Sequence, residues 1–293
     1  MRVLLTGATG FVGRHVLSLL AAADDIVALA RREPPAALAG LATWVRQDLA
    51  SALDRAALPA RIDVVVHLAQ SDRYRDFPDG ARDVVAVNVD AVAELADYAR
   101  TAGARRFVLC SSGGVYGFRG GPAREDDAVA PVSFYQASKY AGEVLLAPYA
   151  KLLQTVVLRP FFVYGAGQRG MLVAGLAERV LRGEPVSIDG DPGLRINPIH
   201  VHDAARAIAA AVAADDELRV VNVAGDETAT LTQIVTRLGA AAGVEPRVVH
   251  AGDGPPGELL GDNTRMRELL GVTPQVALDE GLRGVVDELR GAG

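Results

Sequence analysis

Short apolar runs alternate with longer segments of helical periodicity over the first 160 residues. The runs are rich in Val, Leu and Ile and are apolar on both faces, which is typical of strands buried between two layers of helix. Right-handed crossovers would join them into one parallel, doubly wound α/β sheet of the Rossmann type. We predict strands over 2–5, 26–30, 44–46, 63–67, 106–111 and 155–158, and helices over 11–23, 52–58, 82–102 and 134–152.

The pattern changes after Pro160, where glycine and proline become frequent up to residue 200. We expect the rest of the chain to form a smaller C-terminal α/β lobe that binds substrate, interrupted by a return to the main sheet. The predicted dinucleotide-binding domain spans 1–159 and about 201–223, and the predicted substrate lobe spans about 160–200 and 224–293. The predicted elements of this half are helices over 171–182, 204–214, 231–242, 263–270 and 279–289, and a strand over 220–223.

Composition narrows the class of protein. The 293 residues are 50% hydrophobic, which suffices for a large core and argues against disorder. A net charge of −6 makes nucleic acid or an anionic membrane an unfavourable partner. The single cysteine, Cys110, excludes an internal disulfide framework. The apolar run at the N-terminus is only a strand long, and no stretch reaches the ~18 apolar residues of a membrane span, so we expect a soluble, cytoplasmic protein.

A glycine-rich loop follows the first predicted strand and opens the first predicted helix. It reads TGATGFVG, with glycines at positions 7, 10 and 13. The first glycine permits a tight turn, the second lets the backbone approach a pyrophosphate, and the third lets helix and strand pack closely. The helix N-terminus directs N–H groups at the phosphates. The predicted phosphate-binding residues are Gly7, Thr9, Gly10, Phe11, Val12 and Gly13.

The end of the second predicted strand bears on the choice of cofactor. An NAD-binding fold usually has Asp or Glu there, about 20 residues after the glycines, to bind the ribose 2′-hydroxyl. This chain instead has Ala30 followed by Arg31 and Arg32. Two guanidinium groups suit a 2′-phosphate, so the sequence favours NADP(H). Because Glu33 could still reach the ribose, NAD(H) stays open.

Candidate catalytic groups occur at Tyr135 and Lys139, which share one helix face at a spacing of four residues. An ammonium beside a phenol favours the phenolate, and the phenol can then exchange a proton with a hydroxyl or a carbonyl. The fifth predicted strand ends in SSGGVYG, at the sheet edge where ligands bind. We choose Ser112 as the hydroxyl that holds the reacting oxygen, with Ser111 as the alternative.

Taken together, these motifs resemble the extended short-chain dehydrogenase/reductases, the superfamily of nucleotide-sugar epimerases, dehydratases and ketoreductases. The resemblance covers nearly the whole chain. The segments that carry it, in family order and spacing, are TGATGFVG, the pair Asp48-Leu49, the triplet His67-Leu68-Ala69, the pair Asn88-Val89, SSGGVYG, YQASK, LRPFFVYG, VNVAGDET and DNTRMRELLGVTP.

The resemblance implies roles for several residues. It places Asp48 and Leu49 near the adenine, and it makes Ser112, Tyr135 and Lys139 the catalytic set. Homodimers are common in the family, so a homodimer is expected here. The remaining residues that it assigns to the cofactor are Leu68, Ala69, Gln70, Asn88, Pro160, Phe162 and Val163, of which Phe162 is also assigned to the substrate.

The chain departs from the family pattern at three places. Gly113 and Gly114 stand where the dehydratases carry an Asp-Glu pair, so dehydration is not expected. Phe162 replaces a frequent Asn that contacts substrate phosphate, and Gln70 replaces an expected alanine and adds an amide near the cofactor. Arg195 suits a substrate diphosphate, with a surface salt bridge as the alternative.

A metal is not expected. His200 and His202 alternate in a predicted strand beside Asp203, but no third histidine is near them in the sequence, and the resembled family uses no metal.

The leading functional hypothesis is an NADPH-dependent reductase of a 4-keto sugar nucleotide. The close alternative is a nucleotide-sugar 4-epimerase that retains tightly bound NAD. The remote alternative is a non-catalytic dinucleotide-binding sensor, against which the intact Ser112, Tyr135 and Lys139 argue. An epimerase should purify with its cofactor bound, whereas a reductase should consume NADPH stoichiometrically. The expected substrate is a nucleoside-diphosphate sugar.

Overall fold

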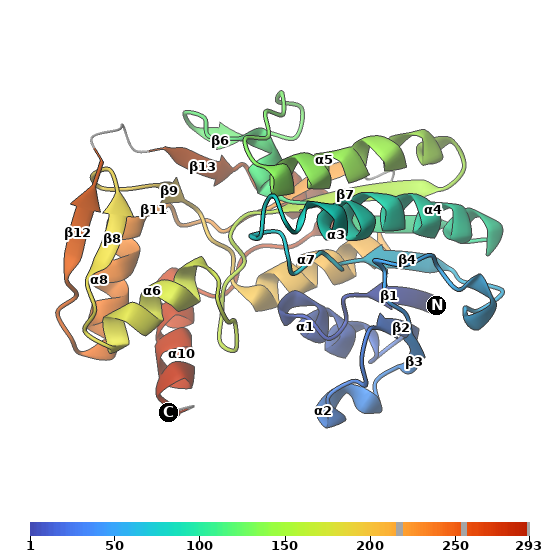
Figure 1. The fold of residues 1–293 in the computed structure, drawn as a ribbon, viewed down its shortest axis with the longest axis horizontal. Helices are drawn as coiled ribbons and strands as arrows, with labels where there is room; N and C mark the ends of the chain where they lie inside the picture. Colours follow the sequence, from blue (N-terminus) through green and yellow to red (C-terminus); the bar gives the residue numbers. More distant parts are fainter. Residues whose placement is uncertain (215–218, 253–256, 292–293) are drawn as a thin grey trace.

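The computed structural model describes residues 1–214, 219–252 and 257–291. Its centre is a parallel sheet in the order β10-β7-β5-β4-β1-β2-β3 (Figure 1). The doubly wound α/β fold predicted from the sequence is confirmed. The strands of this sheet are β1 (Arg2–Thr6), β2 (Asp25–Ala30), β3 (Thr43–Arg46), β4 (Val64–His67), β5 (Arg106–Cys110), β7 (Gln154–Pro160) and β10 (Val220–Val223).

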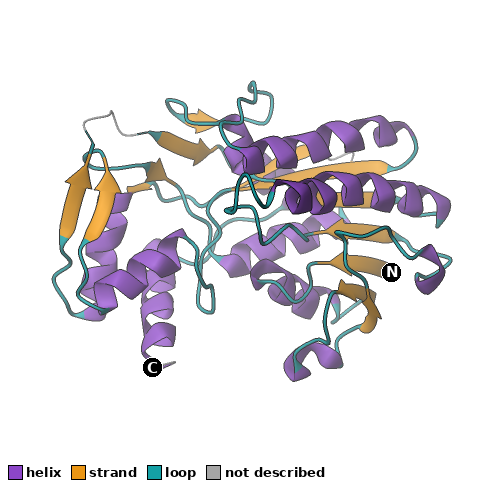
Figure 2. Ribbon diagram, viewed as in Figure 1, coloured by secondary structure: helices purple, strands orange, loops and turns teal. Residues whose placement is uncertain are grey.

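Helices cover both faces of the sheet (Figure 2). Successive side chains of a strand point to opposite faces, so Val3 and Leu5 of β1 pack in one core while Leu4 packs in the other. Each fully buried side chain of this kind stabilises the fold by about 1.5–3 kcal/mol. The first core also receives α1 (Phe11–Leu20), α2 (Ala36–Ala39), α7 (Val201–Ala213) and α9 (Thr264–Leu270), and the second receives α4 (Ala91–Thr101) and α5 (Phe134–Leu146).

The order of the strands fixes where a ligand can bind. The connections run outward in one direction from β1 through β2 to β3, and in the other direction from β4 through β5 to β7. The carboxyl ends of β1 and β4 therefore flank a switch point, and the loops that leave them diverge to opposite faces. Such a divergence opens a crevice beyond the strand ends, which is where open α/β sheets bind ligands.

A second set of elements packs beyond those strand ends, at the left of Figure 1. Its own core lies between three helices and a parallel strand pair. A small sheet in the order β11-β9-β13-β6 lies between this set and the main sheet. The elements are α6 (Leu172–Leu181), α8 (Leu231–Ala242), α10 (Leu278–Gly291), β8 (Val186–Asp189), β12 (Val248–Ala251), β6 (Pro122–Ala123), β9 (Arg195–Ile196), β11 (Ala229–Thr230) and β13 (Glu258–Gly261).

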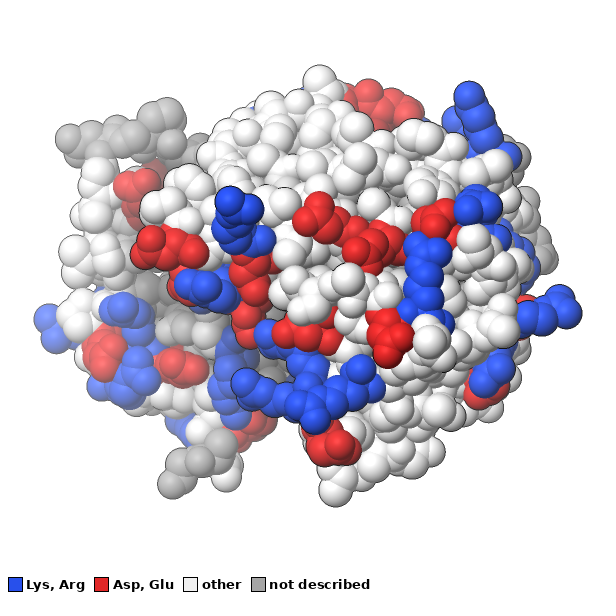
Figure 3. All heavy atoms as spheres, turned by 45° about the vertical axis from the view of Figure 1, so that its right-hand side comes forward, with Lys and Arg blue, Asp and Glu red and all other residues white. Residues whose placement is uncertain are grey.

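We keep the predicted boundaries of the two lobes as a proposal. Segments 253–256 and 292–293 of the predicted substrate lobe lie outside the described residues. Within the described ranges, no helix has the length and apolarity needed to cross a membrane. On the face drawn in Figure 3, acidic and basic side chains lie interspersed in small groups.

Two predicted helices differ in the structure. The segment predicted as a helix over 52–58 contains only the short 3₁₀ helix η1 (Arg55–Ala57), where the Asp54 carboxylate accepts a hydrogen bond from Ala56 N at 3.1 Å. Such a side-chain bond to the local backbone competes with helix formation. The helix predicted over 82–102 is divided into α3 (Ala81–Val85), the π-helical turn η2 (Ala86–Asp90) and α4.

The predicted strand around His200 and His202 is also wrong, because α7 begins there. His200 is the N-cap of α7, and its ring nitrogen Nδ1 accepts a hydrogen bond from His202 N at 3.4 Å. The fold also brings a third histidine near, since the ring centroids of His15 and His202 are 5.0 Å apart. Even so, no group of three or more His, Cys, Asp or Glu among the described residues is arranged to hold a metal.

Candidate functional site

The glycine loop forms a cradle that side chains would fill. Gly7 has a φ of +71°, and a Cβ there would lie 2.7 Å from Ala69 N. A Cβ on Gly13 would lie 1.9 Å from the carbonyl oxygen of Gly7, so α1 packs directly on the loop. Gly10 caps α1 without a side-chain hydrogen bond, and the first N–H groups of the helix are therefore available to an anion. This arrangement fits a dinucleotide pyrophosphate.

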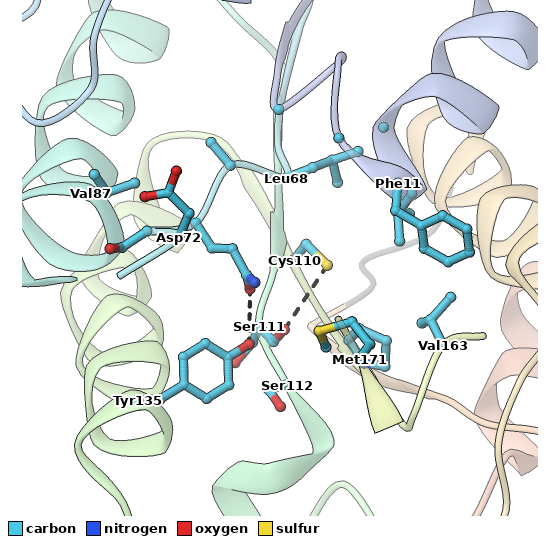
Figure 4. Close-up of a pocket in the computed structure, with 18 of the residues that line it drawn as sticks. Phe11, Leu68, Asp72, Val87, Cys110, Ser111, Ser112, Tyr135, Val163 and Met171 are labelled. Atoms are coloured by element: carbon cyan, nitrogen blue, oxygen red, sulfur yellow. Dashed lines mark hydrogen bonds between the residues drawn. The ribbon is translucent and has the colours of Figure 1, made fainter. Parts of the chain in front are cut away.

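A cavity of about 600 Å³ extends from this cradle to the start of α5. It lies at the carboxyl ends of β1, β2, β4 and β5, and Figure 4 shows part of its lining. Most residues that the sequence assigns to cofactor or substrate line it. These are Gly7, Thr9, Gly10, Phe11, Val12, Gly13, Arg31, Asp48, Leu49, Leu68, Ala69, Gln70, Ser112, Tyr135, Pro160, Phe162 and Val163.

Helix α5 carries the Tyr–Lys pair. Its N-cap is Ser133, whose hydroxyl accepts a hydrogen bond from Gln136 N at 3.2 Å, so Tyr135 lies in the first turn. The Tyr135 hydroxyl donates to Oε1 of Gln70 at 2.9 Å (Figure 4). Burial raises the pKa of the Tyr135 phenol, and a hydrogen bond with the Ser112 side chain opposes that rise. The phenol is thus favoured in its neutral form, and the predicted serine is near enough to affect its pKa.

Lys139 lies one turn further along α5, outside the set of residues that line the cavity. Its side chain is only 5% exposed, and burial lowers the pKa of its ammonium group. Its charge acts on Cys110 and His67, and it contributes to lowering the pKa of His67 after burial itself. In the structure the charge of Lys139 thus acts on buried groups outside the set that lines the cavity, except Cys110, and its catalytic role stays a prediction.

The two adjacent serines after β5 have different partners. Ser111 is buried, and its hydroxyl donates to the carboxylate of Glu143. Ser112 caps the short 3₁₀ helix η3 (Gly113–Tyr116), where its Oγ accepts a hydrogen bond from Gly114 N at 3.1 Å. Ser111 is therefore committed to Glu143, whereas Ser112 is near enough to Tyr135 to affect its pKa. The choice of Ser112 as the oxygen-binding hydroxyl stays a prediction.

Phe162 adopts an unusual backbone conformation in the cavity wall. Its φ is +44°, in the left-handed region that non-glycine residues rarely occupy. The resembled family frequently has Asn at this position, and Asn tolerates that region better than Phe does. The chain therefore accepts strain here to keep a large apolar side chain beside Pro160 and Val163, and such strain is typical of ligand sites.

Asn88 is buried, and its side chain forms hydrogen bonds with two other segments of the protein. In the π-helical turn, its side chain accepts a hydrogen bond from Ser71 N at 3.0 Å and donates to Ser138 Oγ at 3.0 Å. It is 2% exposed and is not among the residues that line the cavity. A Cβ on Gly142 of α5 would lie 2.9 Å from the carbonyl oxygen of Asn88, so the two helices pack closely there. Asn88 thereby links the loop after β4 to α5, and its predicted contact with the cofactor stays untested.

Two predicted arginines lie outside the cavity wall. Arg195 donates from Nη1 to Oε1 of Glu258 at 2.6 Å, and its side chain is half exposed. Leu259, which follows Glu258 in β13, does line the cavity, so Arg195 lies close to the cavity wall without being part of it. Arg32 is exposed and does not line the cavity. The substrate role of Arg195 and the cofactor role of Arg32 remain predictions.

A buried ion pair lies behind Ser111 at the end of β5, and it was not predicted from the sequence. Nη2 of Arg159 lies 2.6 Å from Oε2 of Glu143, and both side chains are 6% exposed. The Arg159 guanidinium also lies 4.7 Å from the ring centroid of Tyr116, whose hydroxyl donates to Asn222 Oδ1 at 2.9 Å. The signal available in the sequence was Glu143, four residues after Lys139 on the same helix face.

The sequence analysis also missed two acidic residues of the cavity wall, Asp72 and Asp83. Asp72 follows β4, and its Oδ2 accepts a hydrogen bond from Nη2 of Arg31 at 2.8 Å. Asp83, on α3, accepts a hydrogen bond from the hydroxyl of Ser71. The sequence does not predict that these two residues line the cavity, because their position depends on the course of the loop after β4 in three dimensions.

Comparisons with known proteins show the family to which the chain belongs. The profile described as the NAD dependent epimerase/dehydratase family matches residues 3–224. The chain is 36% identical to a UDP-glucose 4-epimerase from Mycolicibacterium smegmatis, over 99% of each chain. It is 30% identical to a dTDP-4-dehydro-6-deoxy-D-allose reductase from a Streptomyces species, over 93% of this chain and 91% of the relative.

A solved structure is similar over the whole chain. The UDP-glucuronic acid 4-epimerase of Bacillus cereus in complex with UDP-glucuronic acid and NAD has a TM-score of 0.89 and 26% sequence identity, with 100% of both chains covered. The fold of that protein and the fold described here are therefore the same from end to end.

Proposed function

Because the chain belongs to the NAD-dependent epimerase/dehydratase family, we propose that it is a nucleoside-diphosphate-sugar 4-epimerase that uses NAD(H). The observation that carries the proposal is one cavity that holds both the glycine cradle and the Tyr135–Ser112 pair. Relatives with long matches include UDP-glucose 4-epimerases, and similar solved structures contain NAD together with a UDP-sugar.

The side chains around Tyr135 suit proton exchange at a sugar hydroxyl. Ser112 holds the reacting oxygen by a hydrogen bond, and Tyr135 takes its proton or returns one. Burial raises the pKa of the Tyr135 phenol, so a positive charge near it would be needed to favour the phenolate, and Lys139, one turn further along α5, is the proposed source of that charge. When bound, the nicotinamide supplies or accepts the hydride at the sugar carbon.

The choice between the two dinucleotides follows from the cavity wall. The sequence favours NADP(H) through Arg31 and Arg32. In the structure Arg31 is engaged by Asp72, and Arg32 does not line the cavity. Similar solved structures are described as complexes with NAD. These observations support NAD(H) as the cofactor.

A 4-keto-sugar reductase is the second candidate. It is supported by the similarity to the Streptomyces reductase and by Arg31, which would favour NADPH if Asp72 released it. Dehydration is not proposed, although a dTDP-glucose 4,6-dehydratase is 30% identical to the chain. A Cβ on Gly113 would lie 2.6 Å from the ring of Phe161, so the acidic side chain that elimination needs has no room there.

The experiment that tests the function begins with the purified protein. Acid denaturation and chromatography of the supernatant identify any dinucleotide that co-purifies. UDP-glucose, UDP-glucuronic acid and dTDP-sugars are then incubated with the protein without added cofactor, and products are resolved by chromatography. An epimerase converts one C4 epimer to the other under these conditions. Turnover that requires NADPH and consumes it stoichiometrically would instead support the reductase. Light scattering tests the proposed homodimer in the same preparation.

A further inference from the structure

Among the described residues that line the cavity, Arg31 carries the positively charged side chain, and this side chain already has a partner. Its Nη2 atom lies 2.8 Å from Oδ2 of Asp72, at hydrogen-bond distance. The two side chains are 54% and 64% exposed. Both line the cavity, and Figure 4 shows Asp72 in its wall. A ligand phosphate that approaches Arg31 therefore meets a carboxylate in the same place.

Two further carboxylates act at this part of the wall. Asp48 and Asp83 line the cavity, and both act on Arg31 electrostatically, as Asp72 does. Each is held in place: Asp48 accepts a hydrogen bond from Ala50 N at 3.0 Å, and Asp83 accepts one from Ser71. The wall thus carries one positive and three negative side chains, and its net charge opposes an additional phosphate group.

We propose that Asp72 makes this cavity select NAD(H) over NADP(H). It does so in two ways: it occupies the guanidinium of Arg31, which a 2′-phosphate would need, and it keeps the adjoining wall negatively charged. The inference rests on the proposed function, because it assumes that a nicotinamide dinucleotide binds here. It adds a specificity-determining residue that neither the glycine loop nor the end of β2 reveals.

The topology explains how an acid from a distant segment takes this role. Dinucleotide folds that prefer NAD usually place the acid at the end of β2. Here β2 ends in Ala30, and the acid follows β4 instead, 41 residues after Arg31. Strands β2 and β4 both pair with β1. The loops beyond their carboxyl ends are therefore close enough for Asp72 to reach Arg31 across the crevice.

The test measures dinucleotide affinity directly, without turnover. The full-length protein is freed of any co-purified cofactor and titrated calorimetrically with NAD⁺ and NADP⁺. The native chain should bind NAD⁺ at least ~10-fold more tightly than NADP⁺. Asp72→Asn keeps the shape of the side chain and removes its charge, so the NADP⁺ affinity should rise by about tenfold while the NAD⁺ affinity changes little. The selectivity of the native chain should also decrease as ionic strength rises, because the pair is exposed.

Asp76→Asn is the matched control. Asp76 lies on the same loop and also pairs with an arginine, Arg73, at 3.3 Å, but it does not line the cavity. It should leave both affinities unchanged. Combining Asp72→Asn with Arg31→Ala should cancel the gain for NADP⁺, because the released guanidinium is then absent. Circular dichroism confirms that each variant is folded.

The outcomes separate this inference from the proposed function. Binding of neither dinucleotide to the native chain would contradict the proposed function itself. Equal affinities would overturn only the role of Asp72. A native preference for NADP⁺ would overturn that role and also the choice of NAD(H) as cofactor, while leaving the dinucleotide site itself in place. An Asp72→Asn variant that is folded and keeps the native selectivity would also overturn it.

Discussion

Two arginine–carboxylate pairs beside the same cavity differ in their surroundings. Arg159 and Glu143 are each 6% exposed and form two hydrogen bonds, at 2.6 and 3.1 Å. Arg31 and Asp72 are each more than half exposed and form one, at 2.8 Å. The first pair lies in the core behind Ser111, whose hydroxyl donates to Glu143. The second lies where ligand and water can both reach it.

The difference in exposure gives the two pairs different uses. Removing one partner of a buried pair leaves an uncompensated charge, which typically costs about 3–5 kcal/mol. An exposed pair contributes only about 0–1 kcal/mol. Glu143 and Arg159 therefore hold α5, β7 and the loop after β5 together. Arg31 and Asp72 can exchange partners at little cost in stability, and this makes them suited to choosing between ligands.

The largest expected effect tests this contrast directly. Glu143→Gln should lower the free energy of unfolding by about 3–5 kcal/mol, because Arg159 remains buried without its counter-ion. Asp72→Asn should lower it by less than about 1 kcal/mol. Urea denaturation followed by circular dichroism measures both. Replacing the buried pair together, as Glu143→Leu with Arg159→Met, should recover part of the loss. Equal losses for the two single variants would contradict the contrast.

The next largest expected effect is on turnover, when the hydroxyl of Tyr135 is removed. Tyr135→Phe keeps the ring and removes the hydroxyl, so kcat should fall by about 100-fold or more, the usual scale for a lost general acid–base. The affinity for NAD⁺ should stay near the native value, because the glycine cradle around Gly10 is unchanged. Steady-state kinetics and calorimetry give the two quantities. A variant with native kcat and intact cofactor binding would show that Tyr135 does not carry the proton.

Buried groups should also control the pH dependence of stability. His67 is 1% exposed, and burial, followed by the charge of Lys139, lowers its pKa from 6.5 to about 3. Since the folded-state pKa lies below the unfolded one, the stabilisation from neutral His67 is complete above pH 6.5 and is lost as the pH falls toward 3. At pH 5 the loss is about 2 kcal/mol.

Variants at two histidines separate this contribution from other titrating groups. His67→Gln removes the titrating group, so it should lose less stability between pH 7 and pH 5 than the native chain does. The exposed His250 provides the control, since His250→Gln should behave like the native chain. Urea denaturation at the two pH values measures the change. A His67→Gln variant with the same acid sensitivity as the native chain would contradict the assignment.

The sequence predicts the fold well because local signals and topology agree. Apolar runs identify the parallel strands, and the glycines of the TGATGFVG loop mark the close packing of β1, α1 and the loop after β4. The helix 52–58 was wrong because local side-chain bonds, such as that of Asp54 to Ala56 N, compete with a weak helical pattern. The strand at His200 was wrong because two alternating residues do not distinguish a strand from a helix cap.

The site was less predictable where it depends on contacts between distant segments. The Ser112–Tyr135 pair and the glycine cradle follow from motifs within single segments. The pairing of Arg31 with Asp72 follows from the course of the loop after β4, which no local pattern encodes. The cofactor preference for NADP(H) predicted from Arg31 and Arg32 did not take the Asp72 carboxylate into account, and it stays untested.

Arg195 resembles Arg31, because it too is exposed and held by a carboxylate. Its side chain is 49% exposed, and Glu258 accepts its hydrogen bond at 2.6 Å. If Arg195 binds the substrate diphosphate, Arg195→Ala should raise KM for a nucleoside-diphosphate sugar by about tenfold, since a charge-assisted hydrogen bond contributes about 1.5–3 kcal/mol and Glu258 competes for it. The affinity for NAD⁺ should not change, because Arg195 does not line the cavity.

Two controls decide how the Arg195 result is interpreted. Arg182→Ala removes an arginine of similar exposure that pairs with Glu184, and it should leave KM unchanged. Glu258→Gln releases Arg195 from its partner, so KM should fall if the diphosphate and Glu258 compete for the same guanidinium. This is the same logic by which Asp72→Asn releases Arg31. An unchanged KM in both Arg195→Ala and Glu258→Gln would mean that this exposed pair is a surface salt bridge without a ligand, and that exposure beside the cavity is not sufficient for selectivity.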